Sequence, residues 1–171
     1  MTTEVLPIPK SATAGPEMSA LAPFYRDWRW AGTIEAGGMG PGSPEMSGVG
    51  SATCRLIQDG LWYANDFQQE QRLVDGSYVL TWKLHWVTGW DARGAEYRAT
   101  SADNNGPTLE IYRGRIEGNR LVYESLSESL PRIRLTWILR DPDHCAWRNE
   151  YTLDGEQWTL IEEYAMEVPA T

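Results

Sequence analysis

Four short turn motifs, each between runs of alternating apolar and polar residues, constrain the fold of this chain more than any other feature. Alternation with a period of two is the pattern of a strand that buries one face. The motifs have the composition of two-residue hairpin loops: Asp59-Gly60, Asp75-Gly76, Gly118-Asn119 and Asp154-Gly155. The sequence therefore predicts antiparallel strands joined by tight turns, and each turn fixes which residues lie opposite one another.

About ten such runs follow one another from residue 26 onward. Successive antiparallel strands with short connections favour an all-β, up-and-down barrel over a sandwich, because closing the sheet removes its free edges. A barrel of about eight strands already has room for a small ligand, so about ten strands predict an internal cavity. The expected strands lie near residues 26–35, 48–58, 61–73, 78–88, 94–103, 108–117, 120–128, 132–140, 144–153 and 156–168.

The segments outside these runs are expected to contribute less to the barrel. Residues 1–16 lack periodicity and are rich in Pro, Gly, Ser and Thr, which predicts a mobile tail before a domain of residues 17–171. Residues 16–25 predict one short helix that closes an end of the barrel, with Pro23 limiting its length. Residues 35–50 hold many Gly and Pro residues without a phosphate-binding motif, and predict a flexible connection.

Composition excludes several classes of protein. A net charge of −9 argues against nucleic acid as a partner. No apolar stretch approaches the roughly 20 residues of a membrane-spanning helix, and the first residues lack the pattern of a signal peptide, so we expect no membrane contact and a cytosolic protein. The two cysteines, Cys54 and Cys145, form no metal-binding motif, so we expect reduced thiols, no metal and no cofactor. A homodimer stays open.

The last hairpin raises the question of function, because its predicted inner face carries polar residues. Closing the hairpin at Asp154-Gly155 gives these inner pairs: Tyr151/Trp158, Asn149/Leu160, Trp147/Glu162 and Cys145/Tyr164. The same turn places these pairs outside: Thr152/Gln157, Glu150/Thr159, Arg148/Ile161 and Ala146/Glu163. An ordinary core has no need of Asn149 or Glu162, whereas a wet or ligand-filled interior can satisfy both.

Inner-face aromatic and polar residues are the candidate ligand-binding residues. The chain has nine Trp and eight Tyr but only two Phe, and Trp and Tyr each bring a polar atom that needs a partner when buried. Taken singly, each of these rings is first of all a core residue. The predicted ligand-binding set comprises Tyr63, Asn65, Trp82, Trp86, Tyr112, Tyr123, Trp137, Trp147, Asn149, Tyr151, Trp158, Glu162 and Tyr164.

Glu162 is the most informative of these residues and the one candidate for catalysis. A carboxyl group in an aromatic interior has a raised pKa and can exchange protons near neutral pH. The plainer interpretation is a glutamate hydrogen-bonded to Tyr164, Asn149 or water. On the outer face, Asp66 is expected opposite His85, where such pairs are solvated and contribute little.

Three stretches carry a resemblance to a known family: GGMGPGSPEMSGVGSATCRLIQDGLWYANDF, WVTGWDARGAEYRAT and DPDHCAWRNEYTLDGEQWTLIEEYAMEV. Over residues 17–168 the chain resembles a bacterial domain family of unknown function among the calycin-like barrels. The resemblance extends in fold to lipocalins, fatty-acid-binding proteins and nitrobindins. It implies a ten-stranded barrel with an internal pocket and no agreed activity. The nitrobindin likeness also implies haem, but neither His85 nor His144 is predicted to point inward.

These observations favour one function and leave three alternatives open. The favoured function is binding of a small, largely apolar, aromatic or polyene molecule, oriented by Asn65, Asn149 and Glu162. The alternative is a cyclase or isomerase in which Glu162 or a tyrosine hydroxyl moves a proton. Haem binding and a ligand-free interaction module are the minor alternatives.

Overall fold

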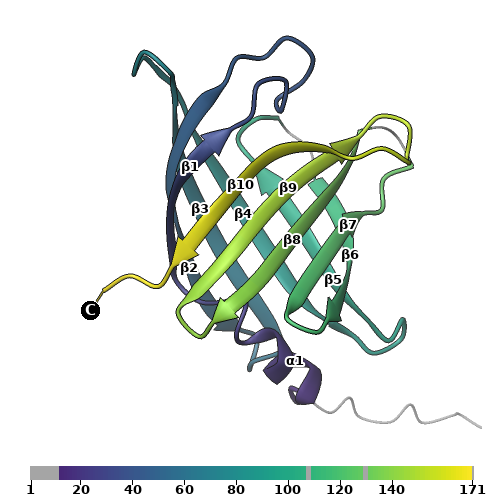
Figure 1. Cartoon of the computed structure of the whole chain (residues 1–171). Coiled ribbons are helices and arrows are strands. Elements are labelled where there is room, and N and C mark those ends of the chain that lie inside the picture. Colours follow the sequence, from purple (N-terminus) through teal and green to yellow (C-terminus); the bar gives the residue numbers. More distant parts are fainter. Residues whose placement is uncertain (1–11, 107–108, 129–130, 171) are drawn as a thin grey trace, which may run out of the picture.

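The computed structural model describes residues 12–106, 109–128 and 131–170 of the chain. Their ten strands form one closed antiparallel barrel (Figure 1), which confirms the predicted fold class. The strands are β1 (Trp28–Ile34), β2 (Met46–Ile57), β3 (Trp62–Leu73), β4 (Tyr78–Asp91), β5 (Glu96–Asp103), β6 (Leu109–Glu117), β7 (Arg120–Ser125), β8 (Arg132–Asp141), β9 (His144–Thr152) and β10 (Thr159–Glu167).

Each strand pairs with the next one in the sequence, and β1 pairs with β10 to close the ring. Pairing of Ala31 with Ala165 and with Val49 places β1 between the last and the second strand. This is the up-and-down order that the succession of short turns predicts, because a tight turn can only join neighbouring antiparallel strands. No strand of the barrel leaves a full edge unpaired within the described residues.

The register predicted from three of the four turns is confirmed, except beside the Asp75-Gly76 turn, where Tyr78 lies opposite Arg72 instead of the expected Leu73 and is exposed. In the β3–β4 hairpin, Asn65 lies opposite Trp86 and Gln69 opposite Trp82. The other two turns give Cys54/Asn65 and Leu56/Tyr63 in β2–β3, and Ile116/Leu121, Gly114/Tyr123 and Tyr112/Ser125 in β6–β7. Lys83 and His85 are exposed on the outer face, as expected for residues that alternate with buried ones.

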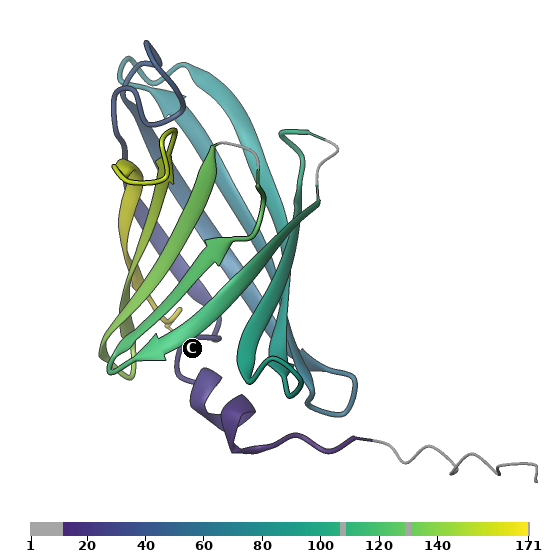
Figure 2. The same ribbon diagram turned by 90° about the vertical axis from the view of Figure 1, so that its right-hand side faces the viewer.

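A short helix, α1 (Pro16–Leu21), covers one end of the barrel, here called the closed end (Figure 2). Met18 and Leu21 of this helix are buried. The segment that follows sends Tyr25 into the barrel, where its ring stacks on Tyr63 at 5.2 Å and its hydroxyl accepts a hydrogen bond from the Trp86 indole at 3.0 Å. The predicted helix over residues 16–25 is thus confirmed in place and shorter in length. Of the predicted tail, residues 1–11 lie outside the described residues.

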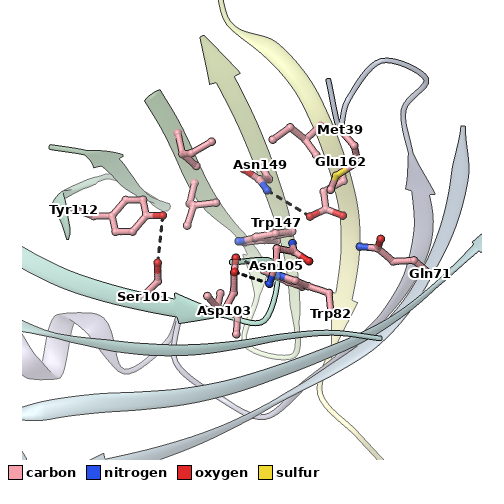
Figure 3. Close-up of a pocket in the computed structure, with 14 residues that line it drawn as sticks. Met39, Gln71, Trp82, Ser101, Asp103, Asn105, Tyr112, Trp147, Asn149 and Glu162 are labelled. Carbon is pink, nitrogen blue, oxygen red and sulfur yellow. Dashed lines mark hydrogen bonds between the residues drawn. The ribbon is translucent and has the colours of Figure 1, made fainter. Parts of the chain in front are cut away.

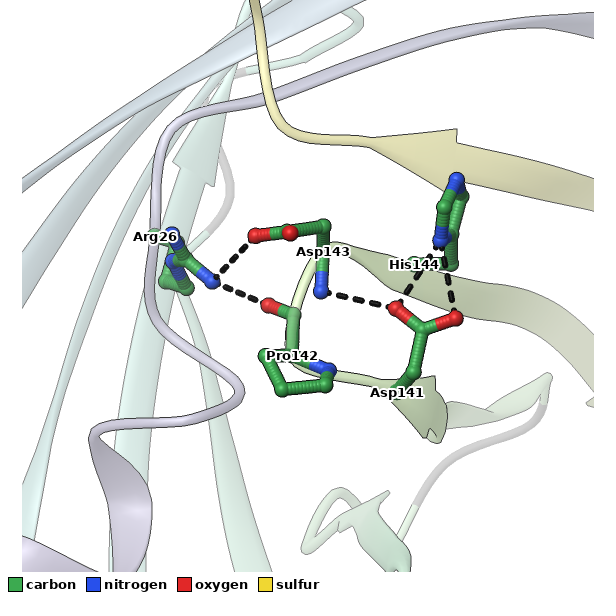
Figure 4. Close-up of polar contacts among 5 residues, drawn as sticks. All are labelled: Arg26, Asp141, Pro142, Asp143 and His144. Carbon is green, nitrogen blue, oxygen red and sulfur yellow. Dashed lines mark hydrogen bonds and ion pairs between the residues drawn. The ribbon is translucent and has the colours of Figure 1, made fainter.

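Arg26 ties the chain after α1 to the turn between β8 and β9 (Figure 4). Its guanidinium donates hydrogen bonds to the carbonyl oxygen of Pro142 and to the carboxylate of Asp143, the latter at 3.1 Å. The Asp141 carboxylate accepts hydrogen bonds from the Asp143 amide and pairs with His144 in the same turn. These contacts hold the closed end together from outside, while the aromatic residues fill it from within.

Aromatic rings fill the interior near the closed end. Trp86 lies at their centre, 4.9 Å from the Tyr112 ring, 5.1 Å from Tyr123 and 5.9 Å from Trp137. Trp28, Trp86, Trp137 and Tyr123 are almost fully buried. These large side chains fill the half of the barrel next to α1, and the opposite end is here called the mouth.

The predicted register of the last hairpin is wrong by two residues. Glu162 lies opposite Asn149, and Tyr164 lies opposite Trp147, because the loop spans residues 153–158 instead of two residues. The Asp154 carboxylate explains the wider loop: it accepts hydrogen bonds from the backbone amides of Glu156 and Gln157, both at 2.8 Å. Local hydrogen bonds of this kind compete with a tight hairpin.

Two side-chain orientations change with this register. Trp158 was expected inside, but its ring lies against the Arg134 guanidinium on the outer face, 4.2 Å from the ring centroid. Ile161 was expected outside, yet it is buried, because a bulge between Leu160 and Glu162 breaks the alternation. Thr152 and Glu150 were also expected outside and are buried. Glu150 forms an ion pair with Arg134 at 2.9 Å on the outer face.

Replacing Gly155 with Val is expected to destabilise the fold by roughly 1–3 kcal/mol, because Gly155 has a φ of 81° and a β-branched residue resists that conformation. Thermal and urea unfolding measure the difference. Gly106→Val is the matched control, since Gly106 needs no positive φ and a Cβ there meets no atom within 4 Å. Equal stability of the two variants would contradict the described loop.

Candidate functional site

A cavity of about 190 Å³ opens at the mouth of the barrel (Figure 3). It lies on the opposite side of the aromatic core from α1. Aromatic and aliphatic side chains form most of its wall, and polar side chains form the rest. The lining residues are Met39, Gln71, Trp82, Leu84, Ser101, Asp103, Asn105, Tyr112, Ile133, Leu135, Trp147, Asn149, Ile161 and Glu162.

Glu162 is the centre of the polar group in this cavity. The Tyr164 hydroxyl donates to its carboxyl group at 2.5 Å, and the Gln69 amide donates to the same oxygen at 3.1 Å. The Asn149 amide donates to the other oxygen at 3.4 Å. The indole of Trp30 in turn donates to Gln69 at 2.8 Å. Side chains of four strands therefore hold a carboxyl group that is only 4% exposed.

The bulge in β10 is what places Ile161 beside Glu162 on the cavity wall. An extra residue in one strand turns consecutive side chains toward the same side. Ile161 and Glu162 therefore both line the cavity, one as apolar wall and the other as its carboxyl group. A regular strand would have sent one of the two outside.

Two glycines make room for the tyrosine that holds Glu162. A Cβ at Gly32 would lie 2.4 Å from the Tyr164 ring, and one at Gly48 would lie 2.6 Å from its hydroxyl. The ring also stacks on Trp147 at 6.0 Å with an interplanar angle of 8°. Tyr164 is thus wedged between backbone and indole, which fixes the direction of its hydroxyl toward Glu162.

Burial raises the pKa of Glu162, and the hydrogen bonds from Tyr164, Gln69 and Asn149 only partly offset this effect. Burial also raises the pKa of Tyr164 well above its usual range, with the neighbouring Glu162 adding to the shift. The pair therefore favours its neutral forms. A neutral carboxylic acid inside a cavity can donate a hydrogen bond as well as accept one.

Several polar atoms at the cavity are buried without a hydrogen-bond partner. They are the side-chain oxygens of Gln71 and Asn149 and the indole nitrogen of Trp147. An unpartnered buried donor or acceptor costs roughly 1–3 kcal/mol, so such atoms call for a partner that fills the space beside them. All three belong to residues that line the cavity.

The predicted ligand-binding residues fall into three groups. Those that line the cavity are Trp82, Tyr112, Trp147, Asn149 and Glu162. Those in the aromatic core toward the closed end are Tyr63, Asn65, Trp86, Tyr123 and Trp137. Of the remaining three, Tyr164 lies behind Glu162, Tyr151 is half-buried beside the loop that carries Gly37, and Trp158 lies outside the barrel.

Sequence reasoning missed several lining residues. Gln71 and Leu84 lie between exposed residues and already point inward in the register predicted from the Asp75-Gly76 turn, and Ser101 lies between half-buried Thr100 and exposed Ala102. Ile133 and Leu135 of β8 lie among half-buried and buried residues, so alternation there gives a weaker signal. Ile161 depends on the bulge. Met39, Asp103 and Asn105 lie at or beyond strand ends, where alternation gives no direction. Asp103 is held there by its own contacts, accepting hydrogen bonds from the Trp82 indole at 3.3 Å and the Asn105 amide at 2.9 Å.

Neither histidine faces the cavity. His85 pairs with Asp66 on the outer surface at 2.6 Å, and His144 pairs with Asp141 in the turn at the closed end. The haem hypothesis therefore receives no histidine ligand from the lining residues. Within the described ranges, no group of three or more His, Cys, Asp or Glu side chains is placed to hold a metal ion.

The outer Asp66–His85 pair lacks the arrangement of a nucleophilic triad. Thr53 lies opposite Asp66 on the far side from His85, so the aspartate separates the hydroxyl from the histidine. A triad needs the histidine in the middle. The cysteines are equally unsuited as nucleophiles, because burial raises the pKa of both Cys54 and Cys145 to about 12.

No helix in the described part of the chain is long and apolar enough to cross a membrane.

We expect Glu162→Gln to become increasingly stable relative to the wild type as pH rises. The folded-state pKa of Glu162 is raised, so the stability of its buried neutral form is complete below the unfolded value of about 4.3 and is lost as pH rises through the folded value. Gln keeps the hydrogen bonds from Tyr164 and Gln69 by turning its oxygen toward them, and it does not titrate. Melting temperatures of both proteins from pH 4 to 8 measure the trend.

Glu163→Gln is the control for this series, because Glu163 is exposed and contacts Arg148 on the outer face at 3.6 Å. A difference between Glu162→Gln and the wild type that stays constant or shrinks with pH would show that Glu162 is charged in the folded state.

Comparison with known proteins identifies a family that matches the chain and a solved structure with a similar fold. Residues 14–166 match the model of a family described as a protein of unknown function (DUF1579). The crystal structure of Rv2717c from M. tuberculosis is similar with a TM-score of 0.62 and 13% sequence identity, covering 92% of this chain and 99% of that one. At this identity the likeness shows the fold alone. No curated protein gives a match.

Proposed function

The chain belongs to the DUF1579 family, and we propose that it binds a small, mostly apolar molecule with an aromatic ring in the mouth cavity of its barrel. One observation carries this proposal: the cavity is bounded by aromatic walls and holds buried polar atoms that lack partners. The aromatic core next to α1 also holds such atoms, on Asn65 and Trp137, whereas those of Gln71, Asn149 and Trp147 belong to residues that line the cavity. A ligand that touches both kinds of surface satisfies them together.

The volume of the cavity limits the size of the ligand. A cavity of about 150 Å³ in another protein holds benzene, so about 190 Å³ fits a molecule with one ring and a short substituent. A long polyene exceeds this space. Of the two ligand types expected from the sequence, we therefore propose the aromatic one and not the polyene.

The surroundings of the cavity fit a binding protein of the calycin type, and this classification is part of the proposal. The barrel is sealed at one end by α1 and open at the other, where the loop bearing Met39 leans over the cavity. Lipocalin-like barrels hold one small ligand in such a space. A cytosolic location belongs to the same proposal and is supported by the two free cysteines.

A cyclase or isomerase is the second candidate, and the Glu162–Tyr164 pair is the observation that favours it. A buried carboxyl group with a raised pKa, at 2.5 Å from a tyrosine hydroxyl, is able to give or take a proton beside a bound substrate. Binding alone has no need of proton transfer. The enzyme is distinguished by turnover that is lost in Glu162→Gln while ligand affinity is kept.

We expect the wild type to bind the single-ring probe 2-phenylethanol, with quenching of tryptophan fluorescence by contact with Trp82 and Trp147. Ile161→Phe fills part of the cavity and should weaken binding at least tenfold, which is about 1.4 kcal/mol. The matched control is Ile111→Phe, because Ile111 is exposed on β6 outside the barrel. Fluorescence titration and calorimetry measure the affinities, and thermal melting verifies that both variants fold.

Absence of binding by the wild type would contradict the proposal. The interaction-module hypothesis would then take its place. Equal weakening in both variants would place the probe elsewhere on the protein.

A further inference from the structure

We propose that the molecule bound in the mouth cavity carries a protonated amine on a short chain attached to its aromatic ring. This inference rests on the proposed function and specifies the chemical class of the ligand. It follows from the charges and the unpartnered atoms of the wall.

The wall of the cavity carries acidic residues and no basic ones. Asp103 and Glu162 both line the cavity, and no Lys, Arg or His is among the described lining residues. A carboxylate ligand would meet the Asp103 carboxylate, the neutral carboxyl group of Glu162 and no cation, so a fatty acid or other organic anion is disfavoured by repulsion from Asp103 and by loss of its hydration. An ammonium group would be attracted by the Asp103 carboxylate and could donate a hydrogen bond to the neutral carboxyl group of Glu162.

The unpartnered atoms of the wall point to the same class of ligand. The side-chain oxygens of Gln71 and Asn149 are buried and accept no hydrogen bond. Gln71 is itself only 3% exposed, and Figure 3 shows its side chain directed from the side of the cavity toward Glu162. An ammonium group has three N–H donors and no acceptor, so it can satisfy acceptors that would stay unpaired beside an anion.

One unpartnered atom of the wall is a donor, the indole nitrogen of Trp147. It is matched by a hydroxyl, ether or carbonyl oxygen on the same ligand, or by a water molecule beside the amine. The ligand chemistry that fits all of these atoms is an alkylamine that bears an aromatic ring and at most one oxygen substituent, not an acid.

The aromatic side chains of the wall can contact a cation as well as an aromatic ring. Trp82, Trp147 and Tyr112 all line the cavity. The face of an indole or phenol ring attracts an organic cation, most strongly where water is excluded. The apolar wall of Leu84, Leu135 and Ile161 takes the hydrocarbon part of the ligand.

Asp103 and Glu162 have different roles in this arrangement. Glu162 lies deep in the barrel and its oxygens already accept three hydrogen bonds. Asp103 is less buried and lies at the end of β5, where Trp82 and the Asn105 backbone hold its carboxylate in place. We therefore assign the main attraction of the cation to Asp103, and polar contacts around the ammonium group to the Glu162 side.

Three probes of nearly equal size and different charge test the inference: 2-phenylethylamine, 2-phenylethanol and phenylacetate. Calorimetry at pH 7 is expected to show the amine binding at least tenfold more tightly than the alcohol, and the acid most weakly of the three. Asp103→Asn should weaken the amine about tenfold and leave the alcohol within about twofold.

Asp75→Asn is the matched control, because it removes the same charge from the exposed β3–β4 turn near the mouth without touching the cavity. It separates a specific contact from attraction by the net charge of −9. Melting temperatures of both variants verify folding.

The outcomes distinguish this inference from the proposed function. An amine that binds no better than the alcohol, or an acid that binds best, overturns the inference and leaves the binding function standing. Equal loss in Asp103→Asn and Asp75→Asn overturns the assignment of the contact to the cavity. If none of the three probes binds, the proposed function fails.

Discussion

Closure of the sheet between β1 and β10 directs the inner side chains of ten strands into one shared interior, and the rest of the structure depends on how that interior is filled. Near α1, the Tyr123 ring meets Trp86 and Trp137 edge to face, and the three rings leave little space. Toward the mouth, smaller residues such as Ser101 and Leu135 take the inward positions. The cavity is the part of the interior that the aromatic core does not reach.

Most of the fold was predictable from the sequence because its signals are local. Turn composition and period-two alternation located all ten strands to within a few residues and fixed the register of three hairpins. The inward direction of Trp82, Trp147 and Glu162 followed from the same alternation. These residues needed no knowledge of distant parts of the chain.

What could not be predicted depends on interactions that break the alternation. The Asp154 side chain widens the last loop by binding two backbone amides, and the bulge before Glu162 then turns Ile161 inward. Trp158 was placed inside on the assumption of a two-residue turn. The alternation pattern predicts neither the bulge nor the role of Asp103, which lies at a strand end.

The chemistry of the mouth depends on a buried acid that the surrounding residues keep in place. Tyr164 is fixed by Trp147 on one face and by two glycines beside it, and it directs its hydroxyl to Glu162. Gln69 and Trp30 extend this network to β3 and β1. Such a preorganised wall costs little to order when a ligand arrives, which is how a small contact area gives useful affinity.

The indole N–H of Trp147 is the most direct reporter of whether the cavity takes a ligand. In protein labelled with ¹⁵N-tryptophan, the Trp147 resonance, assigned by its loss in Trp147→Phe, should shift as 2-phenylethanol is added, because its unpartnered nitrogen gains an acceptor. The Trp28 indole, which donates to the Phe24 carbonyl at the closed end, should stay in place. A Trp147 resonance that moves no more than that of Trp28 would contradict the account.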